Sequence, residues 1–162
     1  MSAFPAPHEA ARPATGDDVA AVAAMVGAAG AEKREQRGGE LWWRRERRQG
    51  HPVAALDDLV ASAGHEVAVG TLDGTPIGYG VARVERLADG GLLGVVEDIW
   101  VDPEARAVGV GEALMDHLLG WCRERGCFGV DSLALPGDRA TKNFFESFGL
   151  VARAIVVHKP LD

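Results

Sequence analysis

The spacing of apolar residues divides the chain into a helical part, a run of strands, and a part in which helices and strands alternate. "VAAVAAMVGAAGA", residues 19–31, predicts an amphipathic helix capped by "TGDD", and residues 31–49 and 52–63 predict further helical pieces broken by glycine and proline. "HEVAVGTLDGTPIGYGVARVERL" predicts two strands joined by a tight turn, and "LLGVVEDIWV" predicts a third. These three strands are expected to form an antiparallel meander.

After residue 103 the period changes from that of a strand to that of a helix. Val110, Leu114, Leu118 and Trp121 recur at helical spacing, and Gly126 ends the predicted helix. "CFGVDSLAL" then predicts a buried strand, "GDRATKNFFESF" a helix, and "LVARAIVVHKP" a last strand. This order predicts an α+β fold in which helices flank one mixed, mostly antiparallel sheet.

The length of 162 residues, with 47% hydrophobic and 25% charged residues, is ordinary for one globular domain with a single core. We expect a flexible tail over residues 1–9 and a single domain over residues 10–162. A formal net charge of −7 argues against nucleic-acid binding. The apolar run at residues 19–31 is too short to span a bilayer, so no membrane partner is expected either. Two cysteines and scattered histidines predict a reducing, cytoplasmic location and no metal site.

The segment "DPEARAVGVGEALM" places Gly109 and Gly111 at the start of the long predicted helix, although glycine inside a helix costs up to about 1 kcal/mol relative to alanine. The first turn of a helix has unpaired N–H groups that suit a pyrophosphate, and glycine lets the phosphates approach the backbone. An NTPase phosphate loop is excluded, because Glu112 and Ala113 stand where Lys and Ser or Thr are required. A dinucleotide fingerprint lacks its third glycine, because Leu114 stands there.

Two segments resemble the GNAT superfamily of N-acyltransferases. "EDIWVDPEARAVGVGEALMDHL" is similar to the superfamily's acyl-CoA pyrophosphate motif, and "ATKNFFESFGLV" is similar to its C-terminal helix and turn. The resemblance covers roughly residues 10–160. It implies a GNAT-like fold with a splayed central strand pair, acetyl-CoA as the acyl donor, and an amine of a small molecule or a protein as the acceptor.

The resemblance also implies roles for residues around the glycine turn. Backbone groups of Ile99, Trp100 and Val101 would pair with the pantetheine arm of the cofactor. Asn143 would hydrogen-bond the cofactor near its thiol end. The pyrophosphate would be bound by the turn that comprises Arg106, Ala107, Val108, Gly109, Val110, Gly111 and Glu112.

Glu97 and Asp98 lie in an otherwise apolar predicted strand, with side chains on opposite faces unless a bulge intervenes. In the superfamily, acids of this strand often bind the amine or take its proton. Glu97 is therefore the preferred base and Asp98 the reserve, and the alternative is that one of them pairs with a core arginine. Phe145, which would border the cofactor, stands where many members have a tyrosine that protonates the departing thiolate.

The segment "ELWWRRERRQG", residues 40–50, belongs to a basic stretch with seven Lys or Arg and four Glu between Glu32 and Arg48. In the superfamily this region borders the acceptor site, so Trp42 and Trp43 are candidate substrate contacts. They could also face a membrane surface or another subunit of a homodimer. The alternative is a solvated basic helix face with the tryptophans packed beneath it.

These observations favour an acetyl-CoA-dependent N-acetyltransferase that transfers the acetyl group directly to a primary amine. The missing tyrosine at Phe145 supports an alternative of a different class, a catalytically weak acyl-CoA-binding sensor or regulatory module.

Overall fold

The computed structural model describes residues 5–45, 53–106 and 108–161, so Ala107 and part of the predicted basic segment lie outside the described residues. Within these ranges, no helix is long and apolar enough to cross a membrane. The elements in chain order are β1 (Glu9–Pro13), α1 (Val19–Arg34), α2 (Gly39–Arg45), α3 (Val53–Ala61), β2 (His65–Leu72), β3 (Thr75–Arg86), β4 (Leu92–Val101), α4 (Val110–Glu124), β5 (Gly129–Ser132) and α5 (Arg139–Ser147).

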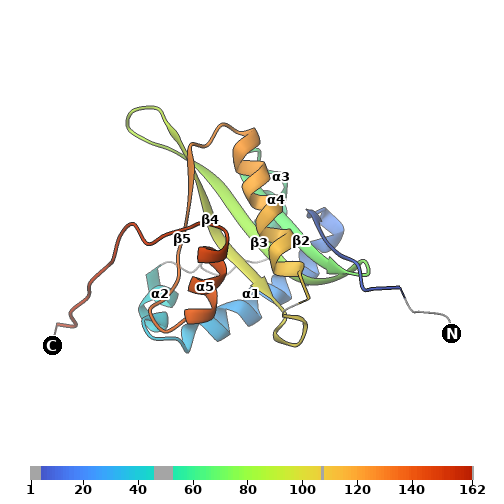
Figure 1. Cartoon of the computed structure of the whole chain (residues 1–162), viewed down its shortest axis with the longest axis horizontal. Helices are drawn as coiled ribbons and strands as arrows, with labels where there is room; N and C mark the ends of the chain where they lie inside the picture. The colour runs from blue at the N-terminus through green and yellow to red at the C-terminus, as the bar shows by residue number, and fades with distance from the viewer. Residues whose placement is uncertain (1–4, 46–52, 107, 162) are drawn as a thin grey trace.

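The strands form a single five-stranded sheet in the order β1-β2-β3-β4-β5 (Figure 1). Strands β1 to β4 pair with one another in antiparallel order, and β5 runs parallel to β4. The predicted mixed sheet with flanking helices is therefore confirmed. The pairing of β4 with β5 covers only Leu93–Val96 and Gly129–Ser132, and beyond these residues the two strands separate. The splayed pair that the resemblance implied is present.

Helix α4 covers one face of the sheet, and α1 and α3 cover the other. The predicted apolar stripe of α4 is buried as expected, with Val110, Leu114, Leu118 and Trp121 all at most 6% exposed. Glycines let this helix lie close to the strands. A Cβ on Gly70 would fall 2.5 Å from Val110 Cγ1, and one on Gly80 would fall 2.7 Å from Leu118 Cδ1.

Asp18 connects β1 to the start of α1. Its carboxylate, 7% exposed, accepts hydrogen bonds from Arg12 Nη1 at 2.7 Å and Nη2 at 2.9 Å, and from the Thr15 backbone N–H at 2.8 Å. The Arg12 guanidinium lowers the pKa of Asp18 to about 2, although burial acts in the opposite direction. Within the predicted "TGDD" cap, Thr15 and Asp18 form a capping box on a short 3-10 helix, Gly16–Asp18, that leads directly into α1, whereas Asp18 makes no side-chain cap bond to α1 itself.

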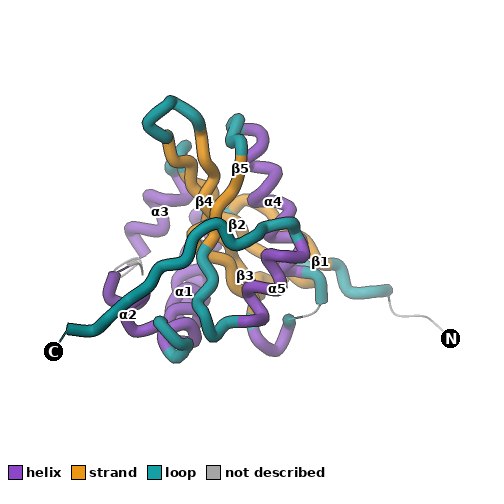
Figure 2. The backbone as a smooth tube through the Cα atoms, turned by 60° about the vertical axis from the view of Figure 1, so that its left-hand side comes forward, coloured by secondary structure: helices purple, strands orange, loops and turns teal. Residues whose placement is uncertain are grey.

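The last predicted strand is wrong. After α5 the chain turns at Gly149, whose φ is +85°, and residues 150–161 form no strand or helix. They run past β5 and away from the body of the protein (Figures 1 and 2). A nearly continuous run of apolar residues, rich in Val and Ile, favours strand geometry, but a strand also needs a pairing partner, and this segment has none within the described part of the chain.

Candidate functional site

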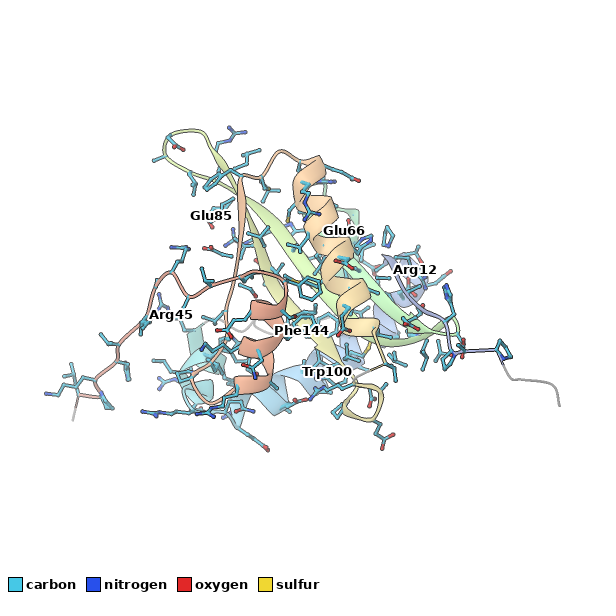
Figure 3. All side chains as sticks on the ribbon, in the orientation of Figure 1. Arg12, Arg45, Glu66, Glu85, Trp100 and Phe144 are labelled. Carbon is cyan, nitrogen blue, oxygen red and sulfur yellow. The ribbon has the colours of Figure 1, made fainter. Side chains whose placement is uncertain are left out.

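A cavity of about 260 Å³ opens where β5 leaves β4. Trp100 of β4 and Phe144 of α5, both labelled in Figure 3, lie on its wall. Further wall residues come from the end of α1, the second half of β4, the start of α4, the end of β5, and α5: Ala29, Glu32, Lys33, Gln36, Glu97, Asp98, Ile99, Val101, Arg106, Gly111, Glu112, Ser132, Leu133, Asp138, Ala140, Thr141 and Phe145. The splayed strands therefore place both predicted acids and part of the glycine turn around one space.

A β-bulge brings the two acids to the same cavity. The β3–β4 register pairs Val81 with Asp98 and Ala82 with Val96, so that Glu97 is the extra residue. Glu97 Oε1 forms an ion pair with Arg83 Nε at 2.6 Å. The arginine pairing that the sequence left open as an alternative thus occurs at Glu97, yet Glu97 also lines the cavity.

Asp98 has two partners that sequence reasoning missed. The Tyr79 hydroxyl donates to Asp98 Oδ2 at 2.6 Å, and Lys33 Nζ lies 3.6 Å from Asp98 Oδ1. Tyr79 is completely buried. Tyrosine is a residue whose buried hydroxyl needs an acceptor, but only the strand register shows which acceptor it meets.

The start of α4 carries two glycines whose missing side chains have different consequences. Gly109 caps the helix with φ of +87°, and a Cβ there would lie 2.8 Å from Glu9 Oε1 of β1. A Cβ on Gly111 would lie 3.4 Å from the Phe144 ring, on the cavity side. Both positions therefore favour glycine, the first by conformation and the second by the space that it leaves in the cavity.

Arg106 holds the turn against β4 and α1. Its Nε donates to the Val101 carbonyl at 2.9 Å, and its Nη1 and Nη2 each bond the Glu32 carboxylate at 2.8 Å. Glu32 also accepts a hydrogen bond from Trp100 Nε1 at 2.9 Å. The Arg106 hydrogen bonds lower the pKa of Glu32. Glu32 is a further cavity residue that sequence reasoning missed, because its partner is distant along the chain.

Only every second residue at the end of β4 turns its backbone N–H and C=O groups toward the cavity. The Val101 carbonyl faces Arg106, whereas the Asp102 N–H donates to Ile77 of β3. Because successive residues of a strand turn their backbone groups to opposite edges, Ile99 shares the open edge with Val101 and Trp100 faces β3. The three predicted pairing residues thus differ in which edge they offer.

Helix α5 brings Phe145 but not Asn143 to the cavity. Phe145 is 7% exposed, belongs to the core beneath α4, and lines the cavity beside Phe144. Asn143 is exposed and lies outside the set of described residues that line the cavity. Asp138, the N-cap residue of α5, lines the cavity and accepts a hydrogen bond from the Thr141 N–H at 3.0 Å.

Trp42 and Trp43 pack on α1 rather than in the cavity wall. Lys33 Nζ lies 4.7 Å from the centroid of the Trp42 ring, and Arg34 Cζ lies 5.0 Å from that of Trp43. Cations over indole rings are a common way to cover aromatic surface. Neither tryptophan belongs to the described residues that line the cavity, and the cations that cover the two rings come from α1.

The acetyltransferase (GNAT) family model matches residues 33–150, which include the bulge, the glycine turn and α5. The chain belongs to the acetyltransferase (GNAT) family. This is a family of acetyltransferases whose members bind acyl-CoA. No curated protein sequence matches the chain.

Solved structures share this GNAT fold at low sequence identity. AAC(6')-Iy in complex with the bisubstrate analogue CoA-S-monomethyl-acetylneamine has a TM-score of 0.72 at 17% identity, covering 96% of this chain and 99% of that chain. The tetramutant of a Bacillus halodurans protein has a TM-score of 0.79 at 16% identity, covering 93% and 99%. An aminoglycoside acetyltransferase from an uncultured soil metagenomic sample, in complex with sisomicin, has a TM-score of 0.68 at 18% identity, covering 95% and 95%.

Proposed function

We propose that this GNAT protein transfers an acetyl group from acetyl-CoA directly to a primary amine of a small molecule or a protein. The observation that carries the proposal is that Glu97 and Asp98 face one cavity, which begins where β5 leaves β4 and reaches the glycine turn of α4. Acetyl-CoA would supply the acetyl thioester and its thiol leaving group.

The residues of the turn fit a pyrophosphate. Gly111 keeps the start of α4 free of a side chain on the cavity side, where the positive end of the helix dipole favours an anion, and the left-handed Gly109 begins that helix. Arg106 would add a guanidinium, which binds phosphate through two donors at once. To do so, its Nη atoms would exchange Glu32 for phosphate. The Val101 carbonyl, which accepts from Arg106 Nε, would pair with a pantetheine amide beside Ile99 once that bond is also released.

The two acids would divide the work on the amine. Asp98, whose oxygens face Tyr79 and Lys33, would orient the incoming amine. Glu97, held at the bulge by Arg83, would accept the proton that the amine loses, directly or through a water. The amine nitrogen could then form its bond to the acetyl carbon as the carbon–sulfur bond breaks. With Phe145 at the position of the usual tyrosine, the departing thiolate would take its proton from solvent.

The charge of the cavity favours a cationic acceptor. Its wall carries five carboxylates, Glu32, Glu97, Asp98, Glu112 and Asp138, against the two cations Lys33 and Arg106. Opposite charge raises the local concentration of a substrate and speeds its association. The structural neighbours in complex with an acetylneamine analogue and with sisomicin are compatible with an amine acceptor of this kind.

The test is a screen of cationic amines and peptides for thiol release from acetyl-CoA, with the melting shift caused by acetyl-CoA alone measured in parallel. Turnover of any amine supports the proposal. A melting shift without turnover would favour the alternative of an acyl-CoA-binding sensor. The buried Phe145 supports this alternative, because its ring cannot donate a proton to the departing thiolate. Absence of both would contradict both functions.

A further inference from the structure

Lysine is scarce in this chain, and one of its lysines lies in the candidate site. The sequence holds three, Lys33, Lys142 and Lys159. The structure describes all three, and of these only Lys33 lines the cavity. The Lys142 side chain is 60% exposed and pairs with Glu146 on α5, and Lys159 is exposed in the segment after α5. The cavity therefore contains a primary amine that belongs to the protein itself.

The ammonium group of Lys33 lies against an indole ring and a carboxylate. Its Nζ is 4.7 Å from the centroid of the Trp42 ring and 3.6 Å from Asp98 Oδ1. The side chains of Lys33 and Asp98 are each 20% exposed. Attraction to the face of the indole and to the carboxylate favours the same position of the cation. The long side chain thus reaches from the last turn of α1 to the acids of β4.

Asp98 is the carboxylate to which the proposed function assigns the incoming amine. Its Oδ2 accepts a hydrogen bond from the Tyr79 hydroxyl at 2.6 Å, so that Oδ1 is the oxygen that faces Lys33. A primary ammonium of the protein therefore occupies the place beside Asp98 that the ammonium of an acceptor would take. Glu97, the proposed proton acceptor, lines the same cavity.

We propose that Lys33 is a self-acetylation site, at which the protein transfers an acetyl group from bound acetyl-CoA to its own Nζ atom. The inference rests on the proposed function, because it uses the same acyl donor and the same acids. Glu97 would take one proton from the ammonium and pass it to solvent. Nζ would then bond to the acetyl carbon as the carbon–sulfur bond breaks. The nitrogen loses a second proton and the thiolate gains one from solvent, so that the products are an amide, coenzyme A thiol and one released proton.

Two features of the kinetics distinguish this reaction from uncatalysed acetylation. An amine tethered beside the bound thioester reacts within one molecule, so its first-order rate constant does not depend on the protein concentration. Uncatalysed acetylation by free acetyl-CoA instead favours the more accessible lysines. Lys142 and Lys159 are exposed, whereas the Lys33 side chain is four-fifths buried, so the two routes predict opposite orders of reactivity.

The test adds acetyl-CoA with a deuterated acetyl group to the full-length protein, with no added amine. Peptide mass spectrometry follows all three lysines in one sample, and the deuterium separates this reaction from any acetylation during expression. Lys33 should be acetylated at least about tenfold faster than Lys142 or Lys159, with a rate constant that is the same after a dilution of the protein by about tenfold. The two exposed lysines are the matched controls for uncatalysed acetylation.

Two variants connect the reaction to the site. Glu97→Gln should slow acetylation of Lys33 by about 10²- to 10⁴-fold, because it removes the proton acceptor. Gly111→Val should reduce it to the uncatalysed rate, because its side chain enters the cavity and would keep acetyl-CoA out. Acetylation of Lys142 and Lys159 should be unchanged in both variants, and thermal melting checks that each is folded. Either variant alone is sufficient if the other fails to fold.

The outcomes separate this inference from the proposed function. Acetylation of Lys33 no faster than that of Lys142 and Lys159 would overturn the inference, and turnover of an added amine by the same preparation would show that the proposed function stands without it. Unchanged rates at Lys33 in the folded variants, or a rate constant that rises with the protein concentration, would also overturn self-transfer. Absence of Lys33 acetylation, amine turnover and a melting shift with acetyl-CoA would contradict both the inference and the function.

Discussion

The hydroxyl of Tyr79 donates a 2.6 Å hydrogen bond to Asp98 across the β3–β4 pair, from a side chain with no exposed surface. Tyr79 belongs to the core between the sheet and helices α1 and α3, whereas Asp98 faces the cavity on the edge of this core. The bond therefore ties a proposed substrate-binding carboxylate to a side chain of the buried core.

Replacing this tyrosine should separate positioning from packing. Tyr79→Phe keeps the ring and removes one hydrogen bond to a charged group, so the free energy of unfolding should fall by about 1.5–3 kcal/mol. If Asp98 orients the amine, KM for the amine should rise while the affinity for acetyl-CoA stays the same. Urea denaturation and steady-state kinetics measure the two effects. An unchanged KM would show that Asp98 needs no support from Tyr79.

The roles of the two acids can be tested with isosteric amides. Glu97→Gln should lower turnover by about 10²- to 10⁴-fold with little change in acetyl-CoA binding, because it removes the proton acceptor. Asp98→Asn should raise the amine KM more than it lowers turnover. The reverse order of effects would assign the base to Asp98. Loss of folding in Glu97→Gln would instead make the Arg83 pair structural.

The glycine turn can be tested by ligand-induced stabilisation. A hundredfold excess of acetyl-CoA over its dissociation constant should stabilise the wild type by about 2.7 kcal/mol. Gly111→Val should abolish most of this shift, because its side chain enters the cavity beside Phe144. Gly120→Val is the control in the same helix, where a Cβ meets nothing within 4 Å. Equal shifts in both variants would rule out the turn as the phosphate site.

Phe145→Tyr tests whether the protein lacks a needed acid. The new hydroxyl would enter a largely buried position without partners arranged to aim it, so turnover should change by less than about tenfold. Turnover on the best amine from the screen is the measurement, with acetyl-CoA affinity as the control. A gain of a hundredfold or more would favour the weakly catalytic sensor.

Acid should weaken the fold through Asp18. Its pKa of about 2 in the folded protein lies below the ordinary 3.8, so its contribution is fully present above pH 3.8 and is lost as the pH falls toward 2. The shift corresponds to roughly 2 kcal/mol at neutral pH. Asp18→Asn should therefore lower the unfolding free energy at pH 7 and flatten its decline between pH 4 and pH 2. Urea titrations at several pH values would show this, and a slope like that of the wild type would exclude Asp18 as the source.

The spacing of residues along the sequence predicted the helices and strands better than it predicted which strands pair and which side chains meet. The helical stripe of Val110, Leu114, Leu118 and Trp121 is buried because period alone determines which face of α4 meets the sheet. The terminal strand was predicted on the same kind of pattern and is not there, because pairing depends on an edge elsewhere in the fold. Likewise, the motifs indicated the acids and the glycine turn, but the Glu32 contact of Arg106 spans 74 positions along the chain. Such pairs depend on how the elements are arranged in space, and the local spacing of residues does not reveal that arrangement.

Two of the glycines beneath α4, Gly70 and Gly80, influence the site without lining it. Gly70 and Gly80 set how deeply the helix sits on the sheet, and the turn at Gly109 is attached to the end of that helix. A single methyl group on either strand glycine would lift one end of α4 and tilt the turn relative to the carboxylates on β4. The distance between the glycine turn and the carboxylates of β4 therefore depends on two strand positions that lie outside the cavity and carry no side chain.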